Sequence, residues 1–69
     1  SEFSEVNIGN PGHIVAYTRD GIAVRLGDGS QMEEQAGLAE NMVSDVRARK
    51  LSVEYIDANT ASPYIRLKK

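Results

Sequence analysis

Cysteine is absent from the chain, and His13 is its one histidine. Without cysteine, neither a disulfide framework nor a thiolate metal site can stabilise the fold. A catalytic or metal-binding histidine needs partner side chains close by, and the chain offers no second histidine or cysteine for that purpose. We therefore interpret His13 as a surface or strand-end residue.

Long hydrophobic runs are also missing. No apolar stretch approaches the roughly 18 to 20 residues that cross a bilayer, and no signal peptide is visible. If the native protein has such segments, we expect them to have been cut away. Residues 1–3, Ser-Glu-Phe, resemble the remnant of a cloning site, so we expect a single small domain over residues 4–69.

Neither sign of charge dominates, because 8 basic residues stand against 10 acidic ones. This balance argues against a surface built mainly to bind phosphate groups. A sheet face that binds RNA also needs stacking aromatic residues among basic neighbours. Tyr17 and Tyr64 lack a flanking basic field, and Tyr55 shares a predicted face with Leu51 and Val53 and is expected in the core. These observations disfavour nucleic-acid binding.

The first part of the chain has the alternation of polar and apolar residues that is typical of strands. Turn formers separate the segments, at Gly9–Gly12 and at Asp20-Gly21. Val6 and Ile8 are predicted to face the core. The three predicted strands, which should form an antiparallel meander, are Glu5–Ile8, His13–Thr18 and Ile22–Leu26.

A helix is predicted from Gln31 to Arg49. Ser30 is suited to be its N-cap, and Glu33 would complete a capping box. Acidic residues near the start and basic residues near the end both suit the helix dipole. One apolar stripe recurs at helical spacing and should pack on a sheet: Met32, Ala36, Ala39, Met42, Val43 and Val46.

Two further strands are expected after the helix. Leu51–Ile56 alternates, with Leu51, Val53 and Tyr55 on one face. A polar loop follows, and Tyr64–Lys68 forms the last strand, with Ile65 and Leu67 toward the core. The fold class is therefore α+β: a small, mostly antiparallel sheet, in the sequence order βββαββ, with one helix packed on one face.

No catalytic, cofactor or metal site emerges from the residues. The turn Gly27–Ser30 has too few oxygen ligands for a calcium loop and lacks the lysine of a phosphate-binding loop. Ser30 and Ser62 have no nearby general base, and Glu33 and Glu34 point to different faces of the helix. We predict that the chain is not an enzyme and needs no cofactor or metal.

The last strand has two interpretations. If it lies at a sheet edge, Pro63, Arg66, Lys68 and Lys69 are the kind of residues that protect an edge from pairing. Alternatively, the same edge is a docking surface for a strand of a partner, with Tyr64 and Arg66 contacting the partner's side chains.

The stretch from Val24 to Asp57 resembles the C-terminal part of the β domain of the bacterial cell-division protein FtsQ/DivIB. The features that carry the resemblance are VRLGDGS leading into MEEQ, and then RARK followed by LSVEYID. The upstream hairpin HIVAYTRDGIAV also fits that family. The resemblance extends from about Ser4 to Leu67, and it depends on the order and spacing of these pieces together.

The resemblance implies a non-catalytic scaffold of the divisome that acts in septum formation. Members of the family are anchored in the bacterial plasma membrane and carry POTRA and β domains on its extracytoplasmic face. They bind the small coiled-coil proteins FtsB/DivIC and FtsL, and the final strands of the β domain take up a strand from the FtsB-type partner. The positions implied here are Asn59, Thr60, Ser62, Tyr64, Ile65, Arg66 and Leu67.

The chain departs from the family in two respects. Many relatives place arginine and an aromatic residue where Asn59 and Thr60 stand. The chain also lacks the POTRA domain, the membrane span and the start of the β domain, so we expect a soluble fragment. Under a second hypothesis, the chain has no binding role of its own. It is then a structural packing subdomain of a larger extracytoplasmic protein, and the missing segments cover its last strand.

Overall fold

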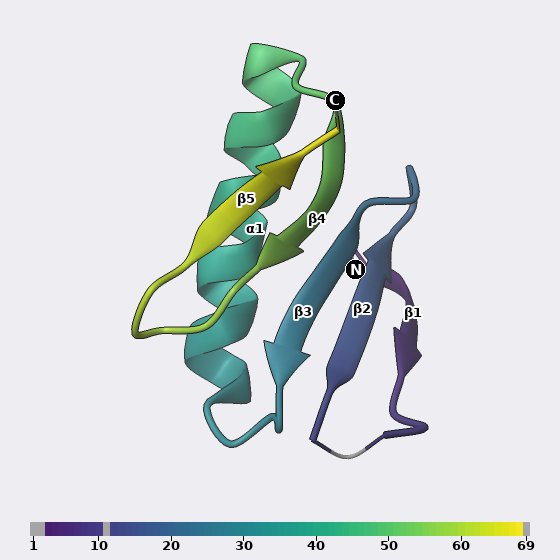
Figure 1. The fold of residues 1–69 in the computed structure, drawn as a ribbon, viewed down its shortest axis with the longest axis vertical. Coiled ribbons are helices and arrows are strands. Elements are labelled where there is room, and N and C mark those ends of the chain that lie inside the picture. Colours follow the sequence, from purple (N-terminus) through teal and green to yellow (C-terminus); the bar gives the residue numbers. More distant parts are fainter. Residues whose placement is uncertain (1–2, 11, 69) are drawn as a thin grey trace.

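The structure is a computed structural model that describes residues 3–10 and 12–68. It contains a five-stranded sheet and one long helix, shown in Figure 1. The elements are β1 (Phe3–Asn7), β2 (Ile14–Thr18), β3 (Ala23–Gly27), α1 (Met32–Arg49), β4 (Val53–Asp57) and β5 (Tyr64–Leu67). Residues 1 and 2 of the presumed cloning remnant, Pro11 of the first predicted turn and Lys69 of the protected edge lie outside the described residues.

The strands are arranged in the order β1-β2-β3-β4-β5. Neighbouring strands are antiparallel except for β3 and β4, which are parallel because α1 connects them. The predicted α+β class, the order βββαββ and the antiparallel meander of the first three strands are therefore confirmed.

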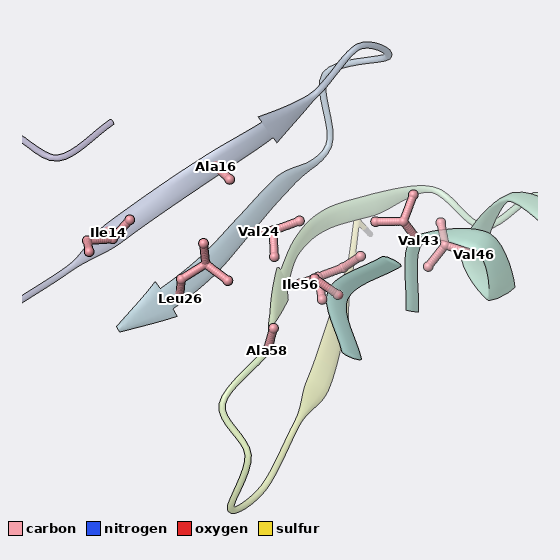
Figure 2. Close-up of a cluster of buried hydrophobic side chains, with 9 residues drawn as sticks. Ile14, Ala16, Val24, Leu26, Val43, Val46, Ile56 and Ala58 are labelled. Carbon is pink, nitrogen blue, oxygen red and sulfur yellow. The ribbon is translucent and has the colours of Figure 1, made fainter. Parts of the chain in front are cut away.

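The core lies between α1 and the sheet face formed mainly by β2, β3 and β4. Val24, Val43 and Ile56 are fully buried at its centre. Figure 2 shows side chains from the strands and from α1 converging there. The complete set of buried hydrophobic residues is Ile14, Ala16, Val24, Leu26, Ala39, Val43, Val46, Ile56 and Ala58.

The start of the helix differs from the prediction. Gln31, not Ser30, occupies the N-cap position, and no side-chain hydrogen bond caps the described helix. The Ser30 N–H instead donates to Oδ1 of Asp28 at 2.9 Å. Because Asp28 closes the turn in this way, Ser30 belongs to the turn rather than to the helix, and the capping box with Glu33 does not form.

The end of the helix agrees better with the sequence. Arg47 and Arg49 lie in the last turn, where the helix dipole favours positive charge. Lys50 then adopts a left-handed conformation with φ of 54°, and the Leu51 N–H returns to the carbonyl of Val46 at 3.1 Å. This left-handed residue ends the helix.

The predictions of burial are wrong for Val6 and Ile8 at the β1 edge of the sheet and for Met32 at the start of the helix. Val6 and Ile8 are 48% and 60% exposed, because α1 packs on β3 and β4 and does not cover β1. Met32 is 38% exposed at the first turn of the helix, and Gln35 takes its place among the buried residues. Phe3 begins β1 and packs against the core, so this strand starts earlier than predicted.

A bulge in β4 accounts for the position of Tyr55. The register between β4 and β5 shifts between Val53 and Tyr55, so these two residues do not share a face in the way that strict alternation predicts. Val53 packs against the core, as does Leu51. Tyr55 lies on the helix-free face, which we call the open face, and the prediction that it is a core residue is wrong.

Candidate functional site

The last strand is an edge of the described sheet. β5 has β4 as its one neighbour in the sheet, and β1 forms the opposite edge. Pro63 immediately precedes β5, and the Lys68 N–H donates to the carbonyl of Ser52 at 2.9 Å just beyond it. The edge position expected for this strand is thus observed.

The hydrogen bond of Lys68 shows which backbone groups of β5 face outward. In an antiparallel pair, the N–H and C=O groups of alternate residues turn toward the neighbouring strand. Since the backbone N–H of Lys68 points toward β4, the backbone groups of Arg66 and Tyr64 point toward β4 as well. The N–H and C=O groups of Ile65 and Leu67 therefore point away from β4, toward the free side of the sheet.

On the open face, three side chains from three strands form one cluster. The Arg25 guanidinium carbon lies 4.3 Å from the centroid of the Tyr55 ring. The rings of Tyr55 and Tyr64 meet edge to face with centroids 6.0 Å apart, and their hydroxyl oxygens are 3.2 Å apart. The hydrogen bond with Tyr55 raises the pKa of Tyr64 above its usual value. Tyr64 is therefore held in place by side chains of β3 and β4.

Arg66 is also held by β4. Its Nε donates to Oε2 of Glu54 at 3.1 Å, and both side chains are more than half exposed. This hydrogen bond and the charge of Glu54 raise the pKa of Arg66. Because an exposed pair of this kind contributes little to stability, an acidic group of a partner could exchange with Glu54 at small cost.

Asn59 closes the loop between β4 and β5. Its Nδ2 donates to Oδ1 of Asp57 and to the carbonyl of Ser62, both at 2.9 Å. Its Oδ1 accepts the Ser62 N–H at 2.6 Å. The side chain of Asn59 and the N–H of Ser62 are thus engaged within the loop itself, where they shape the entry into β5.

The same loop is attached to α1 and to its N-cap residue. The Thr60 hydroxyl donates to Oε1 of Gln31, and Nε2 of Gln35 donates to the carbonyl of Ala58 at 3.1 Å. Gln35 is 6% exposed, so its amide is a buried polar group with a defined partner. The helix therefore fixes the position of the loop that leads to the edge.

The structure brings the seven predicted site residues into one loop and one strand, but in different roles. Tyr64 and Arg66 lie on the open face, and Ile65 packs against the core. Leu67 was predicted to face the core and is 50% exposed. Asn59, Thr60 and Ser62 make contacts within the chain.

Sequence reasoning did not identify Arg25 or Gln35 as parts of this region. Arg25 alternates with the buried Val24 and Leu26 in β3, so it lies on the open face. Its contact with Tyr55 could not be anticipated while Tyr55 was assigned to the core. Gln35 carries no sequence signal, since a polar residue on a helix is normally exposed.

His13 lies just before β2 and is exposed, in agreement with its interpretation as a strand-end residue. It lines a hollow of about 350 Å³ together with Val15, Arg25 and Asp57. The turn Gly27–Ser30 has the structural role expected of it, with φ of 62° at Gly27 and 77° at Gly29. Within the described ranges, no helix is long and apolar enough to cross a membrane.

The chain was compared with protein-family models, curated proteins and solved structures, and none of them matches it.

Proposed function

We propose that this chain is a non-catalytic interaction module that binds a partner by strand addition at β5. The observation that carries the proposal is the free edge of β5, where the backbone groups of Ile65 and Leu67 face outward. Main-chain hydrogen bonds to these groups would contribute affinity, as in other cases of β-strand addition. The strand is preceded by a loop that Asn59 closes internally, so little ordering is needed before a partner binds.

Specificity would come from Tyr64 and Arg66. Both lie on the open face of β5, and both side chains are exposed. Tyr64 offers an aromatic surface that Tyr55 holds in one orientation. Arg66 offers a cation whose partner, Glu54, is itself exposed.

The resemblance to FtsQ/DivIB suggests the biological setting. We propose that the module belongs to a scaffold of the bacterial divisome that acts in septum formation. Its partners would be proteins of the FtsB/DivIC and FtsL type. The full protein would be anchored in the plasma membrane, with this domain on the extracytoplasmic face.

The test is a titration of the isotope-labelled domain with a peptide from the C-terminal region of an FtsB- or DivIC-type protein, followed by NMR. We expect shifts of the backbone amides from Ser62 to Lys68, with the largest at Ile65 and Leu67. The amides of β1, at the opposite edge, serve as the internal control. A peptide that leaves Ser62–Lys68 unchanged would refute strand addition.

One observation favours the second hypothesis, a packing subdomain without a binding role. Val6 in β1 and Ile8 just beyond it are exposed, because α1 does not cover this edge of the sheet. Such side chains suit a surface that another part of a larger protein covers. Amide exchange in a longer protein, without partner, separates the two functions. Slow exchange at Ile65 and Leu67 would favour a covered edge, and fast exchange would favour a free one.

A further inference from the structure

One flank of α1 faces the same side of the molecule as the β4–β5 loop. Gln31 accepts the hydrogen bond from Thr60 in that loop. Within α1 itself, Gln35 donates to the carbonyl of Ala58 in the same loop. Leu38 and Met42 follow three and seven positions after Gln35, so they lie on the same side of the helix. The opposite flank carries Arg47, which pairs with Asp20 at the β2–β3 turn. Figure 1 shows α1 along the β4–β5 side of the sheet, away from β1.

The helix side of β5 is apolar as well. Ile65 pairs with the fully buried Ile56 and packs against the core. Leu67 lies two residues further along β5, so it points to the same side, and it pairs with Val53. It remains 50% exposed.

Four apolar side chains thus lie on the helix side of the molecule, two from α1 and two from the edge strand β5. Leu38, Met42 and Ile65 are half-buried and Leu67 is exposed. We call these four residues the apolar shelf. Two of its members, Ile65 and Leu67, also carry the outward-facing backbone groups of β5.

The geometry of a sheet decides what this surface can accommodate. Residues directly opposite each other on neighbouring strands project to the same face. In a strand added to β5, the residues opposite Ile65 and Leu67 would therefore point toward the apolar shelf. The residues opposite Tyr64 and Arg66 would point to the open face.

We propose that the partner strand is amphipathic and that the residues which pair with Ile65 and Leu67 are aliphatic or aromatic. These residues pack on the apolar shelf, and α1 contributes to recognition through Leu38 and Met42. The inference rests on the proposed strand addition and assigns a second determinant of specificity, on the face opposite Tyr64 and Arg66. Apolar burial on the shelf adds affinity beyond the modest net contribution of the backbone hydrogen bonds, which replace hydrogen bonds to water.

The variant Leu38→Gln tests the contribution of the helix. Binding is measured by fluorescence anisotropy with the labelled FtsB- or DivIC-type peptide, and circular dichroism checks that the variant folds. We expect Kd to rise by about fivefold, because part of the apolar area of one leucine side chain is lost from the interface. The matched control is Met32→Gln, since Met32 lies on the same helix near Ile14 and Gly29 and is 38% exposed. Its Kd should remain that of the wild type.

A second measurement uses the wild-type domain, so it does not depend on the folding of a variant. Two altered peptides carry serine at every second position, one peptide for each face of the strand. We expect one of them to lose affinity together with its sensitivity to Leu38→Gln, and the other to remain sensitive to Leu38→Gln. If the unaltered peptide binds the wild type and Leu38→Gln equally well, the role of the shelf is wrong and strand addition stands. If the unaltered peptide does not bind the wild type, strand addition itself is wrong.

Discussion

Arg47 and Asp20 join the last turn of α1 to the turn between β2 and β3. The Arg47 guanidinium donates from Nε to Oδ2 of Asp20 at 3.0 Å and from Nη2 to Oδ1. The Thr18 hydroxyl donates to the same carboxylate at 2.6 Å. These hydrogen bonds, that of Arg47 foremost, hold the pKa of Asp20 well below its usual range.

This arrangement predicts a pH-dependent contribution to stability. A carboxyl group whose pKa is lowered by folding stabilises the folded state above its unfolded pKa, about 3.9, and that contribution fades as the pH falls toward the folded pKa. Asp20→Asn should therefore lower the free energy of unfolding near neutral pH and make much less difference at about pH 2. Urea denaturation at the two pH values checks this. The control is Asp45→Asn, which breaks only the exposed pair with Arg49 and should change the free energy of unfolding little at either pH. If Asp20→Asn lowers the free energy of unfolding equally at both pH values, the prediction is wrong.

The contact between Tyr55 and Tyr64 predicts a change in titration. The hydroxyl of Tyr55 is the main cause of the raised pKa of Tyr64, so Tyr55→Phe should lower the pKa of Tyr64 toward its usual value. An NMR titration of the Tyr64 ring measures this pKa directly. Tyr17→Phe removes a hydroxyl from β2 and serves as the control, with no change expected at Tyr64. A raised pKa that persists in Tyr55→Phe would mean that burial, not the hydroxyl, is its cause.

The internal hydrogen bonds of Asn59 predict a stability cost at the β4–β5 loop. Asn59→Ala removes three hydrogen bonds that hold the loop, to Asp57 and to two backbone groups of Ser62. We expect the free energy of unfolding to fall by about 1 to 2 kcal/mol, measured by urea denaturation. The control is Asn10→Ala, because the side chain of Asn10 accepts one hydrogen bond, from the Gly12 N–H at 3.3 Å, and its effect should be smaller. Equal effects would show that the loop is not held by Asn59.

The position of α1 predicts a contrast between two valines. Val43 is fully buried and Val6 is 48% exposed, although both were expected in the core. Val43→Ala should lower the free energy of unfolding by about 2 kcal/mol, which includes the cost of the cavity left behind. Val6→Ala should change it by less than about 0.5 kcal/mol. Thermal or urea unfolding of both variants measures the difference, and a large effect at Val6 would mean that β1 has a covered face.

Local patterns in the sequence determined the type and order of the elements. Alternation placed Val24 and Leu26 on the buried face of a strand. Helical spacing placed Ala39, Val43 and Val46 on the buried face of the helix. These patterns are reliable because each depends on residues close together in the chain. The loop and strand of the candidate site were also named from the sequence, and Tyr64 and Arg66 were expected to face outward, whereas the hydrogen bonds of Asn59 and Thr60 within the chain were not expected.

The tertiary structure alone decided how far the helix covers the sheet. A single helix of this length covers β3 and β4, so Val6 on β1 stays exposed although its alternation is that of a buried residue. The bulge in β4 places Tyr55 on the open face, beside Arg25 and Tyr64, and no local pattern in the sequence indicates such a bulge. The sequence thus determined which residues could be buried, whereas packing between distant segments decided which of them are. The reason is that burial depends on a partner surface, and that surface is contributed by residues far away in the chain.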